Sequence, residues 1–277
     1  MIMKKLLLLL ALPFFFSLNS CELLTEEGGL TADKIVQGLK EALTIGADSA
    51  SSSLSLTNGY YHGDVLHIKI PLPEEAENLR NLINQYSSIT SYFNLDTEFE
   101  NVVKAVNRAA EKAASDALPI FADAITDLTI ENGLDILHGI VPETGGGGSD
   151  FDSTAATQYL KIKTYLDLTN LYAPHINAAL DQDLGLGFSA NDAWYTLTQA
   201  YNDALNSNVV QGIILASQFT SKPIVLPAAI ETDLGVFSTQ KALDGLFYMV
   251  GNEEKKIRKD PYQYLSDLLE EVFGSVL

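Results

Sequence analysis

Hydrophobic residues recur every three or four positions along most of this chain, which is the period of an amphipathic helix. The clearest apolar stripes begin at Ile35, Phe99, Tyr159 and Leu243. Thr31 precedes the first stripe, where its side chain can cap the start of a helix. The pattern therefore predicts an all-α fold built as a multi-helix bundle.

One short segment has the alternating pattern of a β-strand instead. Between residues 64 and 70 apolar and polar side chains alternate, and Pro71 then ends the segment. A lone strand is marginally stable, so we expect it to lie across helices or to pair with another short extended piece. The fold should contain at most one or two short strands, around residues 64–70.

One break in composition bears on the domain organisation. Residues 145–148 are four consecutive glycines, which is typical of a flexible linker. A phosphate-binding loop would need a preceding strand and a following Gly-Lys-Ser/Thr, and neither is present. We predict one helical domain over residues 30–277, with a flexible Gly-rich loop near 142–152.

The first twenty residues have the organisation of a secretory signal. Lys4 and Lys5 precede an apolar stretch over residues 6–16, and small polar residues lead to Cys21. The apolar stretch is shorter than the roughly 20 residues that a transmembrane helix requires. We therefore predict a lipoprotein signal peptide over residues 1–20 and a short tether over residues 21–29.

Cys21 is the only cysteine, so it cannot form an intramolecular disulfide. The sequence Leu-Asn-Ser-Cys at residues 18–21 is similar to a bacterial lipobox, which implies that the Cys21 thiol receives diacylglycerol. Two or more acyl chains are enough for stable membrane attachment. The alternative is an ordinary signal peptide followed by an incidental cysteine. The lipobox interpretation predicts a lipoprotein of a bacterial cell envelope, in the outer or inner membrane and facing the periplasm.

The formal net charge of −19 limits the classes of partner. This excess of carboxylates repels phosphate backbones, so we expect no nucleic-acid partner. Basic ligands, divalent cations or a basic protein surface stay open as alternatives, and the need for solubility would by itself explain such a charge.

Several polar residues lie within strongly helical segments and are candidates for a shared site. Asn107 and Arg108 lie four and three residues before Glu111, so all three can share a helix face. They could clamp two helices together, or they could bind a polar ligand and shift a carboxyl pKa for acid–base chemistry. The residues that they could reach on other helices complete a candidate polar cluster of Asn107, Arg108, Glu111, Thr157, Tyr159 and Arg258.

Other charged residues and the histidines give weaker indications of a functional site. Glu254 and Arg258 have the spacing of an exposed helix pair, which contributes a few tenths of a kcal/mol. The four histidines lack zinc-binding spacing. A row of acids is expected to form a solvated face rather than a cation site; its members are Asp123, Asp127, Glu131 and Asp135. We therefore assign no catalytic residue, no metal and no cofactor.

Several segments resemble one family of bacterial envelope proteins, domain of unknown function 4197. These are NRAAEKA at residues 107–113, AATQYL at 155–160 and KALDGLF at 241–247, supported by IKIPLP from Ile68 and EEKKIRKDP from Glu253. They follow one another in order across nearly the whole chain after the signal. The resemblance implies an all-helical, exported protein, often a lipoprotein, and it implies no reaction, substrate or cofactor.

Together these observations favour a membrane-anchored envelope lipoprotein that is a non-catalytic binding or scaffold module, with a small-molecule or protein partner. The alternative is an enzyme with a carboxylate and arginine site around residues 107–111. The two hypotheses differ in whether these side chains open into a solvent-reachable pocket or close on one another inside the core.

Overall fold

The computed structural model describes residues 29–62, 68–142, 151–227, 230 and 232–277. Within these residues the chain forms ten α-helices and one 3-10 helix, and it contains no strand. The predicted all-α fold class is confirmed. The predicted signal peptide, Cys21, most of the tether and the glycine run at 145–148 lie outside the described residues.

The predicted strand is only partly within the described chain, because residues 63–67 lie outside it. Residues 68–70 form no strand. Ile68 and Ile70 are nevertheless buried, and Lys69 between them is exposed, so the alternating pattern correctly indicated which of these side chains are buried. The backbone is not extended there, because residues 68 and 69 lie in a turn and a bend.

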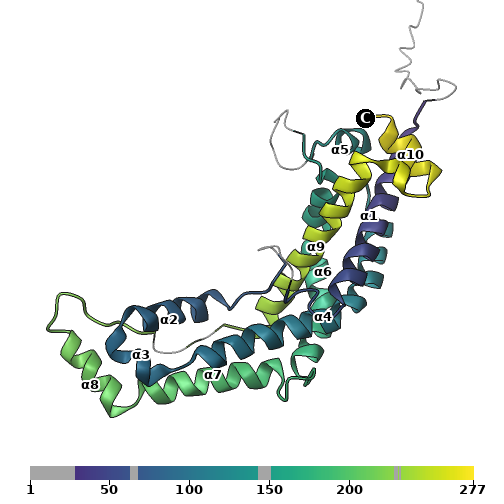
Figure 1. Cartoon of the computed structure of the whole chain (residues 1–277). Coiled ribbons are helices and arrows are strands. Elements are labelled where there is room, and N and C mark those ends of the chain that lie inside the picture. The colour runs from purple at the N-terminus through teal and green to yellow at the C-terminus, as the bar shows by residue number, and fades with distance from the viewer. Residues whose placement is uncertain (1–28, 63–67, 143–150, 228–229, 231) are drawn as a thin grey trace, which may run out of the picture.

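The helices form two arms that meet at an angle (Figure 1). In the upper arm, α1 packs against α9 and α4, and α6 packs against α4 and α9. The far end of this arm is closed by α5, α10 and the 3-10 helix η1. The bounds are α1 (Ala32–Leu54), α5 (Gly133–Leu137), α6 (Ala155–Leu180), α9 (Leu234–Lys259), η1 (Pro261–Gln263) and α10 (Asp267–Gly274).

The lower arm is built from shorter helices around the first half of α4 (Figure 1). Here α7 packs against α4 and α3, and α8 packs against α3 and α7. The bounds are α2 (Glu74–Gln85), α3 (Ser87–Phe93), α4 (Asp96–Asp127), α7 (Ala190–Leu205) and α8 (Asn208–Ser217).

Helix α4 connects the two arms. Its 32 residues span about 48 Å at 1.5 Å per residue. Pro119 lies inside it, and the helix continues past this proline to Asp127 without restarting. The apolar stripe from Phe99 to Ile125 is buried on α4, so a single helix contributes to the core of both arms.

A close contact fixes the turn after α1 against α9. Tyr60 is fully buried and donates a 2.8 Å hydrogen bond from its hydroxyl to the carbonyl of Ala242. The Tyr60 ring fits because Gly245 has no side chain; a Cβ there would lie 2.7 Å from Tyr60 Cε1. This contact positions residues 58–61 beside the polar residues of α4.

Candidate functional site

Asn107 on α4 binds the backbone of the segment that follows residue 67. Its Nδ2 donates to the carbonyl of Ile70 at 2.7 Å, and its Oδ1 accepts from the N–H of Ile70 at 2.9 Å. Nδ2 also donates to the carbonyl of Val103 at 2.7 Å, and Asn107 is fully buried. The amide therefore gives Ile70 the two bonds that a neighbouring strand would otherwise provide.

Glu111 and Arg108 bind the turn after α1. Glu111 Oε1 accepts hydrogen bonds from the N–H groups of Tyr60 at 3.3 Å and Tyr61 at 3.1 Å. Arg108 lies 2.5 Å from the other oxygen of this buried carboxylate, and it donates to Asn58 Oδ1 at 2.7 Å. Asn58 has a positive φ of 69°, a conformation that asparagine tolerates better than most residues. These bonds hold the turn on α4.

A second buried carboxylate, Glu254 on α9, caps α6. Its two oxygens accept from the N–H of Ala156 at 3.0 Å and from the N–H of Thr157 at 2.8 Å. The Thr157 hydroxyl donates to the same carboxylate at 2.6 Å. Thr154, the N-cap residue of α6, provides no side-chain cap of its own. Glu254 therefore satisfies helix N–H groups that would otherwise lack partners, and its charge suits the helix dipole.

Arg258 connects this carboxylate to α5. Its guanidinium lies 2.8 Å from Glu254 and donates to the carbonyls of Leu137 at 2.7 Å and Ile136 at 2.9 Å. The prediction of an exposed Glu254–Arg258 pair is wrong, because Glu254 is 0% exposed and Arg258 is 7% exposed. The reason lies in the helix period. Glu254 lies in line with the apolar stripe of α9, and this position in the sequence indicates that its side chain is buried.

The six residues of the candidate polar cluster therefore lie in separate groups. Asn107, Arg108 and Glu111 contact residues 58–61 and Ile70 rather than the three predicted partners on other helices. Thr157 and Arg258 meet only through Glu254, which the sequence analysis did not assign to the cluster. The Tyr159 hydroxyl donates to the carbonyl of Thr129 at 2.9 Å, away from both groups.

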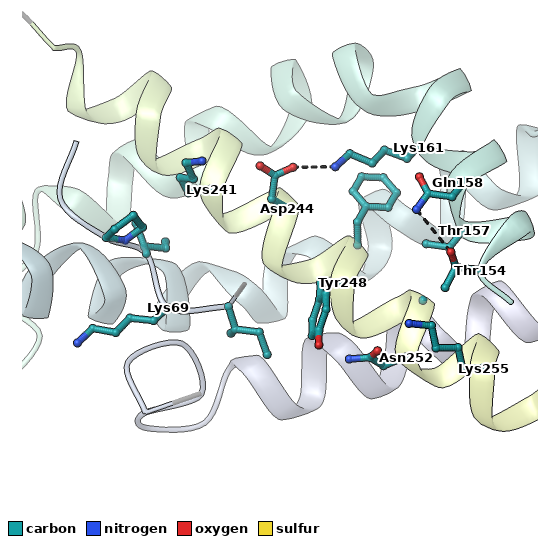
Figure 2. Close-up of a pocket in the computed structure, with 15 residues that line it drawn as sticks. Lys69, Thr154, Thr157, Gln158, Lys161, Lys241, Asp244, Tyr248, Asn252 and Lys255 are labelled. Carbon is teal, nitrogen blue, oxygen red and sulfur yellow. Dashed lines mark hydrogen bonds and ion pairs between the residues drawn. The ribbon is translucent and has the colours of Figure 1, made fainter. Parts of the chain in front are cut away.

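A pocket of about 460 Å³ lies where α6 and α9 face the segment 68–71, and we call it the α6–α9 pocket (Figure 2). Four lysines occur among its lining residues, with one acid, Asp244. This is unusual in a chain with a net charge of −19. The lining includes Ile70, Thr154, Gln158, Lys69, Lys161, Lys241, Asp244, Phe247, Tyr248, Asn252 and Lys255.

The four lysines differ in their surroundings. Lys161 pairs with Asp244 at 2.8 Å, and Lys69 lies over the ring of Tyr61 at 4.4 Å. Lys241 and Lys255 are exposed, and neither forms an ion pair with any residue that the structure describes. Lys69 is also exposed and has no ion pair in the described part of the chain, so three of the four lysines lack an acidic partner.

This pocket was not predicted, although the sequence of α9 contains a pattern that indicates it. Polar residues recur along α9 with the same three- to four-residue spacing as its apolar stripe, so they form a second stripe on another face of the helix. Its members are Lys241, Asp244, Tyr248, Asn252 and Lys255. The contribution of α6 and residues 68–71 could not be found from spacing, because these segments are far from α9 in the sequence.

A second cavity, of about 550 Å³, lies between α4 and α6. Asp123, Asp127 and Glu131 from the predicted acidic row line it, and Asp135 is exposed on α5. In the described part of the chain, no group of three or more His, Cys, Asp or Glu side chains is arranged to hold a metal ion.

Comparison with family models decides the relationship of this chain to other proteins. The model described as "Protein of unknown function (DUF4197)" matches residues 29–274. The chain belongs to the DUF4197 family. A search of curated proteins and a search of solved structures gave no match. In this DUF4197 protein, four of the segments that carry the resemblance, at residues 68–73, 155–160, 241–247 and 253–261, provide walls of the α6–α9 pocket.

Proposed function

We propose that this DUF4197 protein is a non-catalytic binding module of a bacterial cell envelope, held at the membrane by lipid on Cys21. Its ligand binds in the α6–α9 pocket. The observation that carries the proposal is the contrast between this pocket and the other polar groups. Lys241 and Lys255 are exposed and uncompensated, whereas Glu111 and Glu254 are buried and fully bonded.

The same contrast supports binding over catalysis. A general acid or base must reach the proton that it transfers. Both oxygens of Glu111 and both oxygens of Glu254 accept bonds from backbone N–H groups or from an arginine. Arg108 and Glu111 line a separate pocket of about 340 Å³, which is the feature that favours the alternative, an enzyme acting through residues 107–111. To act as an acid or base there, Glu111 would have to release the turn at residues 58–61. A structural clamp accounts for these bonds more directly.

The membrane attachment rests on the lipobox around Cys21. No helix in the described part of the chain is both long enough and apolar enough to cross a bilayer. Wild-type protein should sediment with membranes and resist high salt, and Cys21→Ala should move to the soluble fraction. Metabolic labelling with an alkyne fatty acid should mark the wild type only. Equal membrane retention of Cys21→Ala would overturn the anchoring part of the proposal.

The binding role is tested by thermal denaturation of the detergent-solubilised full-length protein with a panel of neutral, anionic and cationic small molecules. A ligand at one hundred times its Kd should add about 2.7 kcal/mol of stability. Gln158→Trp is the matched variant, because Gln158 is exposed and lines the pocket, so the larger indole there should obstruct ligand entry. A stabilising compound should lose its effect in Gln158→Trp. If every stabilising compound acts equally on this variant, the pocket is not the site.

A further inference from the structure

The second cavity, between α4 and α6, has apolar side chains on both of its walls, and we call it the α4–α6 cavity. Its volume of about 550 Å³ is in the range of small-molecule sites. Leu171 on α6 is 58% exposed, and Ile120 and Ala124 on α4 are half-buried. Leu128 and Leu168 also line the cavity and belong to the core. A ligand here would therefore cover apolar groups from both helices.

Carboxylates also lie on both walls of this cavity. Asp123 and Asp127 are one turn apart on α4, Asp167 lies on α6, and Glu131 follows the end of α4. All four are exposed, and none forms an ion pair with a residue that the structure describes. The lining contains four acids against one lysine, Lys163. The cavity therefore combines an apolar lining with net negative charge.

This charge disfavours ligands that are neutral or anionic. Removing water from an ionised carboxylate is costly unless the carboxylate gains a partner, so a ligand that covers the apolar lining must also supply positive charge. An anionic ligand would place like charges side by side, which is unfavourable. The net charge of −19 on the whole chain attracts cations further.

Inorganic cations and sugars match the lining less well. Within the described residues, no group of three or more His, Cys, Asp or Glu side chains is arranged to hold a metal ion, and a metal ion would leave the apolar groups uncovered. A sugar would need free hydrogen-bonding groups. The hydroxyls of Tyr159 and Thr164 already donate to the carbonyls of Thr129 at 2.9 Å and Leu160 at 2.7 Å. Positive charge on an apolar body is the chemistry that remains.

We propose that the α4–α6 cavity binds a small amphiphilic organic cation. Its ammonium group lies among the carboxylates of Asp123, Asp127 and Asp167, and its apolar body covers Ala124 and Leu171. This is a second binding site, because the α4–α6 cavity and the α6–α9 pocket share no lining residue. The inference therefore does not depend on the proposed function.

Four probes test the proposal by calorimetric titration of the detergent-solubilised full-length protein. Phenylbutyl-dimethylammonium has both a positive charge and an apolar body. Phenylbutanol lacks the charge, phenylpentanoate has the opposite charge, and tetramethylammonium lacks the phenylbutyl body. The first probe should bind at least about tenfold more tightly than each of the others, and added salt should weaken its binding. Equal binding of the neutral or the anionic probe, or no binding of phenylbutyl-dimethylammonium, overturns the inference.

Variants of exposed residues locate the site. Asp127→Asn combined with Asp167→Asn should weaken binding of phenylbutyl-dimethylammonium about tenfold. Asp48→Asn combined with Asp203→Asn is the matched control, since it removes the same charge from exposed positions outside the cavity and should leave binding nearly unchanged. Leu171→Ser should also weaken binding, because it removes part of the apolar wall. Equal weakening by the two double variants overturns the inference.

Gln158→Trp separates this inference from the proposed function. The substitution obstructs the α6–α9 pocket and should leave binding of phenylbutyl-dimethylammonium unchanged, so a loss of binding in this variant overturns the inference. If this probe is the one compound that stabilises the wild type, and it stabilises Gln158→Trp equally, the proposed function fails and the second site stands.

Sedimentation of the wild type tests whether a second copy of the chain occupies the cavity instead. The protein should sediment identically with and without Asp127→Asn and Asp167→Asn. A dimer that this double variant dissociates would overturn the inference.

Discussion

The carboxylate of Glu254 accepts a 2.8 Å hydrogen bond from the N–H of Thr157, 97 residues earlier in the chain. One acid on α9 thus caps α6 and, through Arg258, holds the end of α5. Glu111 on α4 likewise accepts hydrogen bonds from backbone N–H groups of the turn at residues 58–61. Two buried glutamates, each with an arginine on its own helix, fix the irregular parts of the upper arm.

Glu254→Gln should lower the free energy of unfolding by about 3–5 kcal/mol, because it leaves the buried Arg258 charge without its partner. Urea denaturation measures this. Glu271→Gln is the matched control, since Glu271 pairs with Lys34 at the surface, where such pairs contribute about 0–1 kcal/mol. If both variants lose the same stability, Glu254 is not the central clamp.

Asn107→Ala should leave the N–H and the carbonyl of Ile70 without partners. Each unsatisfied buried group costs about 1–3 kcal/mol, so the segment 68–71 should loosen before the rest of the arm. Hydrogen exchange should show faster exchange at Ile70, with Asn78→Ala on the exposed face of α2 as the control. Unchanged protection at Ile70 would contradict the role given to Asn107.

Gly245→Ala should destabilise the protein, because the new methyl group would lie 2.7 Å from the buried ring of Tyr60. Overpacking of this kind typically costs about 1–3 kcal/mol. Gly212→Ala places the same methyl group in α8 with no atom within 4 Å, and it should stabilise by about 0.5–1 kcal/mol. Thermal denaturation of the two variants should therefore show Tm shifts of opposite sign.

Burial raises the pKa of the Tyr201 hydroxyl from 10.0 to about 12. The neutral phenol is favoured in the folded state, so its contribution to stability is complete below pH 10 and is lost as the pH rises towards 12. The free energy of unfolding should fall across this window. In Tyr201→Phe the fall should be smaller. An identical alkaline loss in wild type and variant would contradict this assignment.

Much of the fold was predictable from residue spacing. The cap at Thr31 is confirmed by its bond from the N–H of Lys34, and the apolar stripes of α1, α4 and α9 are buried as predicted. Spacing along one helix also placed Asn107, Arg108 and Glu111 on a common face.

The remainder of the site depends on contacts between distant segments. Periodicity indicates which face of a helix is buried, but it does not say that Glu254 meets the start of α6 or that Asn107 meets Ile70. The prediction of a surface pair at Glu254 is wrong because i,i+4 spacing does not distinguish an exposed face from a buried one, and Glu254 lies on the apolar stripe. A carboxylate on such a stripe needs buried partners, and its neighbours in sequence cannot identify all of them.

The most direct test of the central claim is an amine-labelling footprint of the full-length protein, read by mass spectrometry with and without a stabilising ligand. The account predicts that the ligand protects Lys241 and Lys255 and leaves Lys222 fully reactive. Protection that is absent from both pocket lysines, or equal at all three, would contradict a binding function centred on the α6–α9 pocket.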